Sequence, residues 1–482
     1  MLRRGAVETG ALPRDFIQTL PLERMIELDL PRGLRAATGI DPDLVTRAVE
    51  ALAAAALGAL AVRLTREWGL RGGAALVAAA TIVCGGWLTC FTGLGKPAAL
   101  LCVLTAAALL GATRLARTGQ GGVLLGGSVA AAFLLHRSGL ALAPLWLAAL
   151  VPAFRGHGDP AGRPGLGLGT AAWLPALALV IVAPALWRIL TEFDLPRHLL
   201  PAGATGAGAL ALAVAPLHLL DLANLLVFQT PALVVALALA ARREPAGAQG
   251  VAARLSTWCA LSFVPLLLFV HPIQGVFRDL DVFACAGLAA ALFAAERIGR
   301  AIAAGRLRPW LAPALVAAVV APALQWLLHF HDPARGFARA RAAAVEAPAR
   351  SQDERARLWD ALAYRAFRDR QWDRAVEACE QSARRAPHPR ALTMLAIART
   401  YTGDYRGAES LYVALATRDP GDPLGWLGLA GVSLRLGDSL WSARAMARLE
   451  SYPRGGREAG LIHRHLRAFP VVWPASAGPP PP

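Results

Sequence analysis

Apolar residues dominate one long block of the chain, from about residue 45 to residue 330. Within it, runs of Ala, Leu, Val and Gly are separated by short gaps that contain arginine. A helix that crosses the hydrocarbon core of a bilayer needs about 20 apolar residues, and a soluble core is neither this long nor this uniformly apolar. We therefore predict ten membrane-spanning helices, at residues 45–62, 72–91, 97–113, 120–136, 138–154, 169–189, 223–241, 255–271, 281–296 and 310–330.

Along this block, loops rich in arginine alternate with loops that hold a single basic residue. The arginine-rich loops are predicted to stay in the cytoplasm, so the poor loops and both ends of the chain are predicted to lie outside it. The rich loops hold fourteen arginines: Arg63, Arg66, Arg71, Arg114, Arg117, Arg155, Arg163, Arg242, Arg243, Arg254, Arg297, Arg300, Arg306 and Arg308. The poor loops hold one basic residue each: Lys96, Arg137, Arg197 and Arg278.

Residues 206–222 are apolar enough to be an eleventh span, but counting them would move the Arg242–Arg243 loop to the wrong side. We interpret this segment as a re-entrant or interfacial helix in which Pro216, His218 and Asp221 face protein or water, where polar groups at depth are tolerated. The alternative is one bent span with a local exception to the charge rule.

The N-terminal segment, residues 1–44, is polar to amphipathic. Between Phe16 and Leu28 its apolar residues recur at three- and four-residue steps, with acidic residues between them. This pattern predicts a short helix lying at the membrane interface. A partly disordered tail is the alternative.

The C-terminal region changes in composition and repeats. After a linker at residues 331–352, residues 353–470 show a pattern that recurs about every 33 residues and resembles the tetratricopeptide repeat. Its clearest copy is Leu392, Leu395, Ala396, Gly403, Tyr405, Ala408, Tyr412 and Pro420. Such a stack either binds a protein or peptide partner or only rigidifies the membrane domain. The fold class is therefore all-α, a transmembrane bundle of about ten spans followed by helical repeats and a disordered Pro-rich tail at 471–482.

Composition refines this picture in three ways. The net charge is +16, but the arginines lie at span ends and in the C-terminal helices without interleaved aromatics, which excludes a nucleic-acid partner. Of the 49 basic residues only Lys96 is lysine, which together with the Ala and Gly excess favours a GC-rich bacterial genome. The six cysteines show no CxxC spacing, so we predict neither a disulfide framework nor a metal site.

Candidate chemistry lies near the predicted external face, because ionisable groups at membrane depth are costly and often functional. In the loop after the eighth span, Arg278 is suited to bind a phosphate, and Asp279 and Asp281 are suited to bind a divalent cation. The alternative is that Arg278 only neutralises an Asp at a helix start, where Asp caps well.

Three histidines belong to the same predicted face. His136, in the turn His136–Gly139, is a candidate ligand-orienting or base residue. The alternative is a turn histidine at the membrane interface. His198 and His218 are weaker candidates of the same kind.

Three motifs in this chain resemble those of the C-type glycosyltransferase superfamily, whose multi-pass bacterial members often carry tetratricopeptide repeats after the membrane domain. One branch has an F-x-G-Y-V-E-like motif at the second external loop, a His-x-Ser-like turn between the next two spans, and an R-D-W-D-like motif late in the bundle. The corresponding stretches here are Phe91–Lys96, His136–Ser138 and Arg278–Asp281, in the same order over about residues 20–300. Lys96 stands where the first motif has glutamate.

The resemblance implies sugar transfer from a polyprenyl-phosphate donor at the extracytoplasmic face of a bacterial inner membrane. A carboxylate of the first external loop would activate the acceptor hydroxyl; we favour Glu23 or Asp29, with Glu8 and Glu27 as competitors. An Arg or a divalent cation would stabilise the departing phosphate. The superfamily has a span before this acidic loop, so the resemblance implies either that the start of this chain is truncated or misassigned or that this is a reduced member. An apolar segment of about 20 residues upstream of Met1 would favour the first alternative.

A second hypothesis belongs to another functional class. In it the chain is a non-catalytic membrane scaffold, in contact with membrane lipid, whose repeat domain recruits a protein partner in the cell envelope. A transporter is a poorer third hypothesis, because its ionisable residues would lie near the midplane of the membrane and the sequence shows no inverted repeat.

Overall fold

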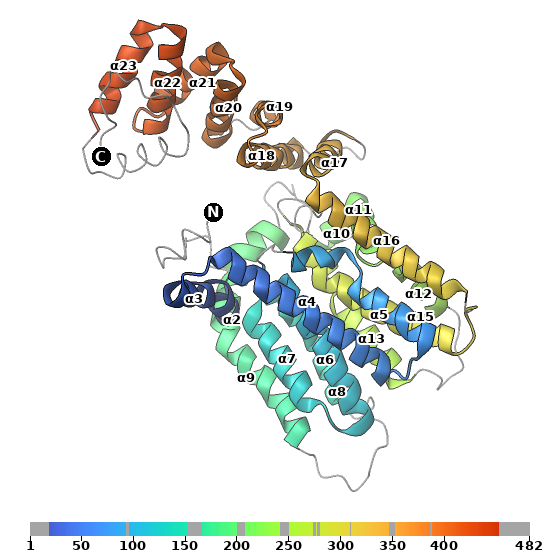
Figure 1. The fold of residues 1–482 in the computed structure, drawn as a ribbon. Helices are drawn as coiled ribbons and strands as arrows, with labels where there is room; N and C mark the ends of the chain where they lie inside the picture. The colour runs from blue at the N-terminus through green and yellow to red at the C-terminus, as the bar shows by residue number, and fades with distance from the viewer. Residues whose placement is uncertain are drawn as a thin grey trace. The chain divides into compact units, whose positions relative to one another are not determined.

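The computed structural model describes residues 19–92, 96–151, 166–199, 208–241, 250–272, 276, 280–308, 310–346, 352–385 and 388–452. Every regular element in these ranges is a helix. The chain divides into two units, residues 1–331 and residues 332–482, and each is described by itself (Figure 1).

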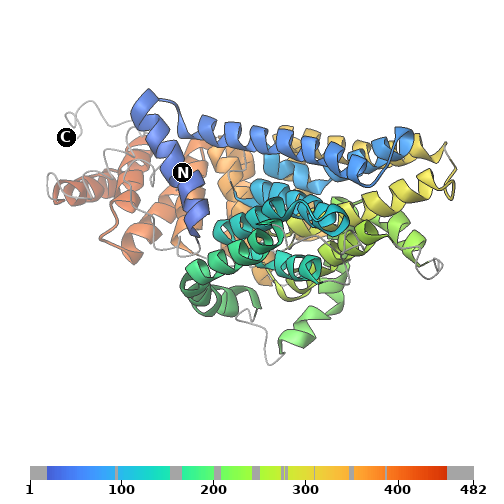
Figure 2. The same cartoon turned by 90° about the horizontal axis from the view of Figure 1, so that it is seen from below.

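The first unit is a helical bundle with α6 and α15 at its centre, since these two helices are the most buried of its long helices. The long α4 runs along one side of the bundle (Figure 2). The helices before residue 200 are α2 (Pro21–Arg24), η2 (Met25–Asp29), α3 (Leu30–Thr38), α4 (Pro42–Glu67), α5 (Gly72–Val83), η3 (Gly86–Phe91), α6 (Ala98–Thr118), α7 (Gly122–Leu135), η4 (Arg137–Leu142), α8 (Ala143–Leu150), α9 (Leu166–Ile189) and η6 (Leu190–Leu199). Those after it are α10 (Ala209–Ala213), α11 (Pro216–Gln229), α12 (Leu233–Ala240), α13 (Val251–Ser262), α14 (Val264–Phe269), η7 (Leu280–Phe283), α15 (Ala284–Ala303) and α16 (Leu311–His331).

Six helices of the described chain are long and apolar enough to cross a membrane, and each overlaps one of the ten predicted spans. They are Pro42–Glu67, Ala98–Thr118, Leu168–Leu195, Val251–Phe269, Leu280–Ala303 and Leu311–His329. Their outward faces are apolar, as a lipid environment requires; α9, for example, exposes Trp173, Val180 and Trp187. The sequence prediction of several apolar spanning helices is thus confirmed at this coarser level.

The other four predicted spans take different forms. The regions predicted at 120–136 and 138–154 contain shorter apolar helices, Gly122–Leu135 and Arg137–Leu150. The region predicted at 72–91 breaks after α5 and continues as η3. The region predicted at 223–241 belongs to a bent pair, in which α11 and α12 meet at 103°.

The break between α5 and η3 follows from close packing against the bent pair. A Cβ atom on Gly85 would overlap the backbone carbonyl of Gln229, and one on Gly86 would overlap the Phe228 ring. Only glycine therefore permits this approach. The bend itself lies after Gln229, so it falls later than the re-entrant segment predicted at 206–222.

The bend is fixed to the central helix α15. Thr230 Oγ1 donates a hydrogen bond to the Gly287 carbonyl at 2.8 Å, and Gln229 Nε2 donates to the Leu280 carbonyl at 3.4 Å. Both side chains are about 1% exposed, and a Cβ atom on Gly287 would overlap the Gln229 amide. The broken span thus packs tightly against the start of α15.

The N-terminal segment is helical where the structure describes it. It runs from α2 through η2 to α3, which ends at Gly39 in a left-handed conformation. Leu20 is fully buried beside Val182, Leu186 and Ile189 of α9. The segment is therefore attached to the bundle by its apolar side, and its position at the membrane interface stays a prediction.

The second unit is a series of helix pairs, each helix packing on the next. Its helices are α17 (Pro333–Val345), α18 (Gln352–Arg368), α19 (Trp372–Arg385), α20 (Pro389–Thr402), α21 (Tyr405–Arg418), α22 (Pro423–Leu436) and α23 (Ser439–Glu450). α17, within the predicted linker, packs on α18, while α18 also packs on α20 and α20 on α22. α19, α21 and α23 begin at residues 372, 405 and 439, which are 33 and 34 residues apart.

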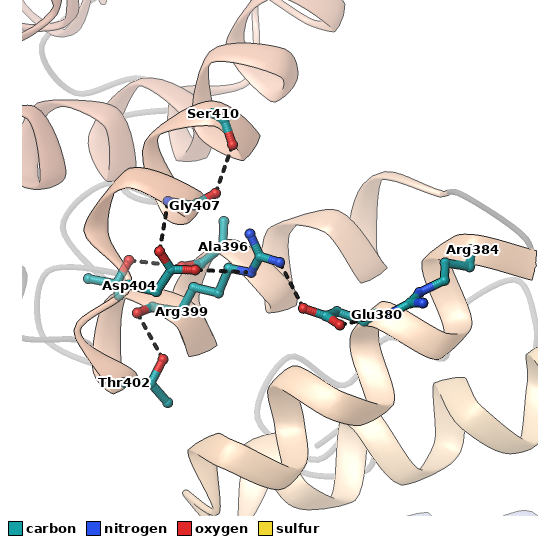
Figure 3. A network of polar contacts seen from close by, with 9 residues as sticks. Glu380, Arg384, Ala396, Arg399, Thr402, Asp404, Gly407 and Ser410 are labelled. Atoms are coloured by element: carbon teal, nitrogen blue, oxygen red, sulfur yellow. Dashed lines mark hydrogen bonds and ion pairs between the residues drawn. The ribbon is translucent and has the colours of Figure 1, made fainter.

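Equivalent contacts recur at this spacing. Trp372 stacks on Tyr401 with ring centroids 4.2 Å apart, and one unit later Arg435 lies 5.3 Å over the Tyr405 ring. Figure 3 shows a further tie, in which Arg399 of α20 reaches Glu380 of α19 at 2.7 Å and Asp404 at 3.6 Å. Each helix pair is thus joined to its neighbour by side chains at its ends.

Candidate functional site

Polar side chains gather where α6 and α15 begin. Lys96, two residues before α6, forms an ion pair with Asp281 of η7, with Nζ and Oδ2 2.7 Å apart. The lysine side chain is 42% exposed and the aspartate side chain is 12% exposed. Deeper between the same helices, the thiols of Cys102 and Cys285 lie 3.8 Å apart. The starts of α6 and α15 therefore lie together.

The turn that contains His136 joins α7 to η4. The backbone N–H of Ser138 donates to His136 Nδ1 at 3.2 Å, and the N–H of Gly139 donates to the His136 carbonyl at 2.8 Å. A Cβ atom on Gly139 would overlap the Ala132 carbonyl, so the turn requires glycine. α7 follows α6 after a short connection and packs on it, so the His136 turn lies at the same end of the first unit as Lys96. Burial has the largest effect on the His136 ring, and the charges of Arg137 and Lys96 add to it. The structure thus brings together two regions that the sequence selected separately.

A second group of polar side chains extends from this turn. Arg137 Nε lies 3.0 Å from Asp194 Oδ2 of η6, and His198 Nε2 lies 4.0 Å from the other oxygen of that carboxylate. The backbone N–H of His271 donates to the His198 carbonyl at 2.9 Å. The His271 ring in turn packs on the His218 ring with centroids 4.2 Å apart. Four separate segments of the chain meet in this group.

Asp194 and His271 were not selected from the sequence, although the weaker candidates His198 and His218 were. Asp194 lies four residues before His198, a spacing that places two side chains on one helical face. That spacing was the available signal. This signal could be used only if the helix was known to continue beyond residue 189. The drop in hydropathy after that residue gives no indication that it does.

The two carboxylates predicted as catalytic bases differ in their surroundings. Glu23 is half-buried on α2, which packs on α7, the helix that ends before His136. Asp29 is exposed and pairs with Arg24 at 3.6 Å. Of the two, Glu23 is therefore the better placed to act together with the His136 turn.

Glu50 is a further carboxylate, which the sequence analysis did not select. It is 3% exposed and continues the buried face of α4 formed by Val45, Ala53 and Leu57. α4 packs on α6 and on η3, the element that leads to Lys96. A buried carboxylate in an apolar helix is costly and often functional, and its place in the apolar stripe was readable from the sequence.

Arg278 and Asp279 lie outside the described residues, so their geometry is not part of this site. Asp281, the described member of the predicted cation pair, is neutralised by Lys96 instead. Within the residues that the structure describes, no group of three or more His, Cys, Asp or Glu side chains is arranged to hold a metal ion. The chemistry of the described site is that of a mixed cationic, carboxylate and imidazole surface.

No protein-family model matches this chain, and neither a curated protein nor a solved structure shows significant similarity to it.

Proposed function

We propose that this chain is a multi-pass protein of a bacterial inner membrane that resembles the C-type glycosyltransferases. In this proposal it transfers a sugar from a polyprenyl-phosphate donor at the extracytoplasmic face. The observation that carries the proposal is the gathering of Lys96, His136, Arg137, Asp194 and Asp281 beside helix ends whose loops are poor in arginine. Arginine-poor loops are typical of the extracytoplasmic side.

The residues of this end match the needs of the reaction. A carboxylate takes the proton from the acceptor hydroxyl, a role that we assign to Glu23 before Asp29 because of its place beside α7. Arg278, or a divalent cation held by Asp279 and Asp281, stabilises the departing phosphate. His136 orients the ligand from the turn between α7 and η4.

The test removes the Asp pair of the predicted motif. The combined variant Asp279→Ala and Asp281→Ala is expected to lose one extracytoplasmic glycan while the chain still accumulates in the membrane. The measurement is mass spectrometry of the cell-envelope glycans from otherwise identical strains. An unchanged glycan profile in a strain that contains the variant at the normal level contradicts the proposal.

A matched control removes two carboxylates from the second unit. Glu346 and Glu450 are exposed on that unit, so Glu346→Ala combined with Glu450→Ala makes the same change in charge away from the site. This control is expected to leave the glycan unchanged. Loss of the glycan in both double variants would point to a general effect of charge removal.

A second candidate function belongs to the second unit, for which we propose tetratricopeptide-like repeats that recruit a protein of the cell envelope. The observation in its favour is the 33- and 34-residue spacing of α19, α21 and α23, with equivalent contacts at Trp372–Tyr401 and Tyr405–Arg435. Stacked helix pairs of this kind present an extended binding surface.

One comparison separates the two functions. If the chain is only a scaffold, deletion of residues 350–470 abolishes the envelope phenotype and the Asp279→Ala, Asp281→Ala variant does not. If the chain transfers sugar, the Asp variant alone abolishes the glycan even though the second unit is intact.

A further inference from the structure

Lys96 is the one lysine in a chain with 49 basic residues. Arginine supplies the positive charge at every other basic position, including the exposed ones where charge alone is sufficient. The ammonium group differs from guanidinium by being compact, strongly hydrated and able to direct three donors from a flexible stem. Lys96 thus differs chemically from every other basic position of the chain.

The surroundings of Lys96 suit the recognition of an anion. Its partner Asp281 is shielded, whereas the lysine side chain is nearly half exposed, so the lysine is accessible to a ligand. One of its three donors is used by Asp281, which leaves two for a ligand. Arg137, the other cation whose charge acts on His136, lies against Asp194 at 3.0 Å. The Lys96 side chain, 42% exposed, is therefore more accessible than that of Arg137, which is 18% exposed.

We infer that Lys96 binds the phosphate group of a polyprenyl phosphate and that Asp281 is its counter-ion when the ligand is absent. A phosphate offers oxygens to a point-charge donor, and the apolar faces of the bundle are where a polyprenyl chain would lie. The lipid part of this inference rests on the proposed function. Lys96 would thus be a phosphate contact in addition to Arg278. This role would account for a lysine where the motif has glutamate.

The single lysine makes a direct test possible. An amine-reactive reagent applied to the purified full chain in detergent modifies Lys96 and the N-terminal amine only, and peptide mass spectrometry separates the two. A polyprenyl monophosphate at ten times its Kd is expected to slow modification of Lys96 about tenfold, because the rate follows the unbound fraction. Modification of the N-terminal amine serves as the internal control and is expected not to change.

Three probes define the ligand. The polyprenyl monophosphate is expected to protect Lys96, whereas the neutral polyprenol and inorganic phosphate at the same concentration are not. Equal protection by the polyprenol shows that the lipid tail alone covers the residue, and protection by inorganic phosphate removes the lipid assignment. Absence of protection by all three overturns the inference.

Two variants separate charge from geometry. Lys96→Arg keeps the charge and the ion pair with Asp281, and Lys96→Met removes both. The inference expects both variants to weaken binding of the polyprenyl monophosphate by about tenfold or more, as the loss of one charge-assisted hydrogen bond does. Wild-type affinity in Lys96→Arg shows that the site needs only a positive charge and contradicts the role of the ammonium.

The outcome for Lys96 is independent of sugar transfer. Protection of Lys96 in a chain whose glycan profile is unaffected by the Asp279 and Asp281 variant supports phosphate-lipid binding and removes the transferase function. Loss of the glycan in that variant without protection of Lys96 leaves the transferase function and removes the inference.

Discussion

At the scale of single residues, Arg370 has an unfavourable backbone conformation. Its φ is +57°, whereas Gly403 and Gly437, which end the first helix of the next two pairs, have φ of +85° and +73°. The three positions are 33 and 34 residues apart and correspond to the residue after a helix end, where glycine is favoured. Arg370 thus stands where the repeat places glycine, and a side chain there costs about 1 kcal/mol.

Arg370→Gly is expected to stabilise the second unit by about 0.5–1 kcal/mol, because relief of the left-handed conformation exceeds the added freedom of the unfolded chain. Gly403→Ala, the reverse change at the corresponding position, is expected to destabilise it by a similar amount. Both changes in stability are measured by unfolding the full chain in denaturant and monitoring the susceptibility of the second unit to proteolysis. A less stable Arg370→Gly variant contradicts the strain and indicates that the arginine side chain stabilises the turn.

Glu380 is expected to make the folding stability of the second unit depend on pH. The hydrogen bond from Arg399 lowers the pKa of the Glu380 carboxyl, an effect that desolvation opposes and Arg384 reinforces. A carboxyl with a lowered pKa stabilises the folded state above its ordinary pKa of about 4.3, and this stabilisation is lost as the pH falls through the lowered value.

Glu380→Gln is therefore expected to lower the melting temperature of the second unit at pH 6 and to have little effect near pH 3. The control Asp373→Asn changes an exposed carboxylate of the same helix and is expected to give similar small effects at both pH values. Thermal unfolding of the full chain at the two pH values is the measurement. An effect of Glu380→Gln that is equal at both pH values shows that charge does not cause it.

At the scale of helices, the sequence predicted the long apolar segments but not the positions at which others break. α4, α6, α15 and α16 are long enough for their composition to determine them. The break at Gly85 and the 103° bend after Gln229 depend on each other and on Gly287 of α15, a contact between distant residues that no local pattern contains. The same limit explains why His271 was missed, since it meets His198 and His218 only through tertiary packing.

Gly287→Ala tests the joint between the broken span and α15. The added methyl group would overlap the Gln229 side chain, so the variant is expected to lose about 1–3 kcal/mol of stability. Gln229→Ala in the same chain is expected to restore part of this loss, because it removes the overlapping atoms. Thermal unfolding of the single and double variants in detergent gives the coupling energy. Strictly additive effects would show that the two residues do not meet.

At the scale of the whole molecule, the two ends of the first unit differ in their ion pairs. Glu67 at the end of α4 lies 3.2 Å from both Arg114 and Arg117 at the end of α6, whereas Lys96 and Asp281 meet at the starts of α6 and α15. Arginine-rich and arginine-poor helix ends are thus on opposite sides of the bundle. From this distribution the positive-inside rule predicts that the Lys96 end faces the extracytoplasmic side.

The same prediction extends to the compartment of the second unit. α16 begins after the arginine-rich loop that ends at Arg308 and finishes at His331, where the second unit begins. If α16 crosses the membrane once, the repeats share a compartment with Lys96, His136 and Asp281. Both proposed functions depend on this shared compartment, because the transferase site and the partner of the repeats would otherwise be separated by the membrane.

The most direct measurement is therefore a pair of reporter fusions in a bacterial host. Alkaline phosphatase, which is active only outside the cytoplasm, and a fluorescent protein that folds only inside it are each fused after Tyr452 and, for comparison, after Arg243. The account predicts phosphatase activity without fluorescence after Tyr452 and fluorescence without phosphatase activity after Arg243. Fluorescence after Tyr452 would place the repeats in the cytoplasm and contradict the arrangement on which both functions rest.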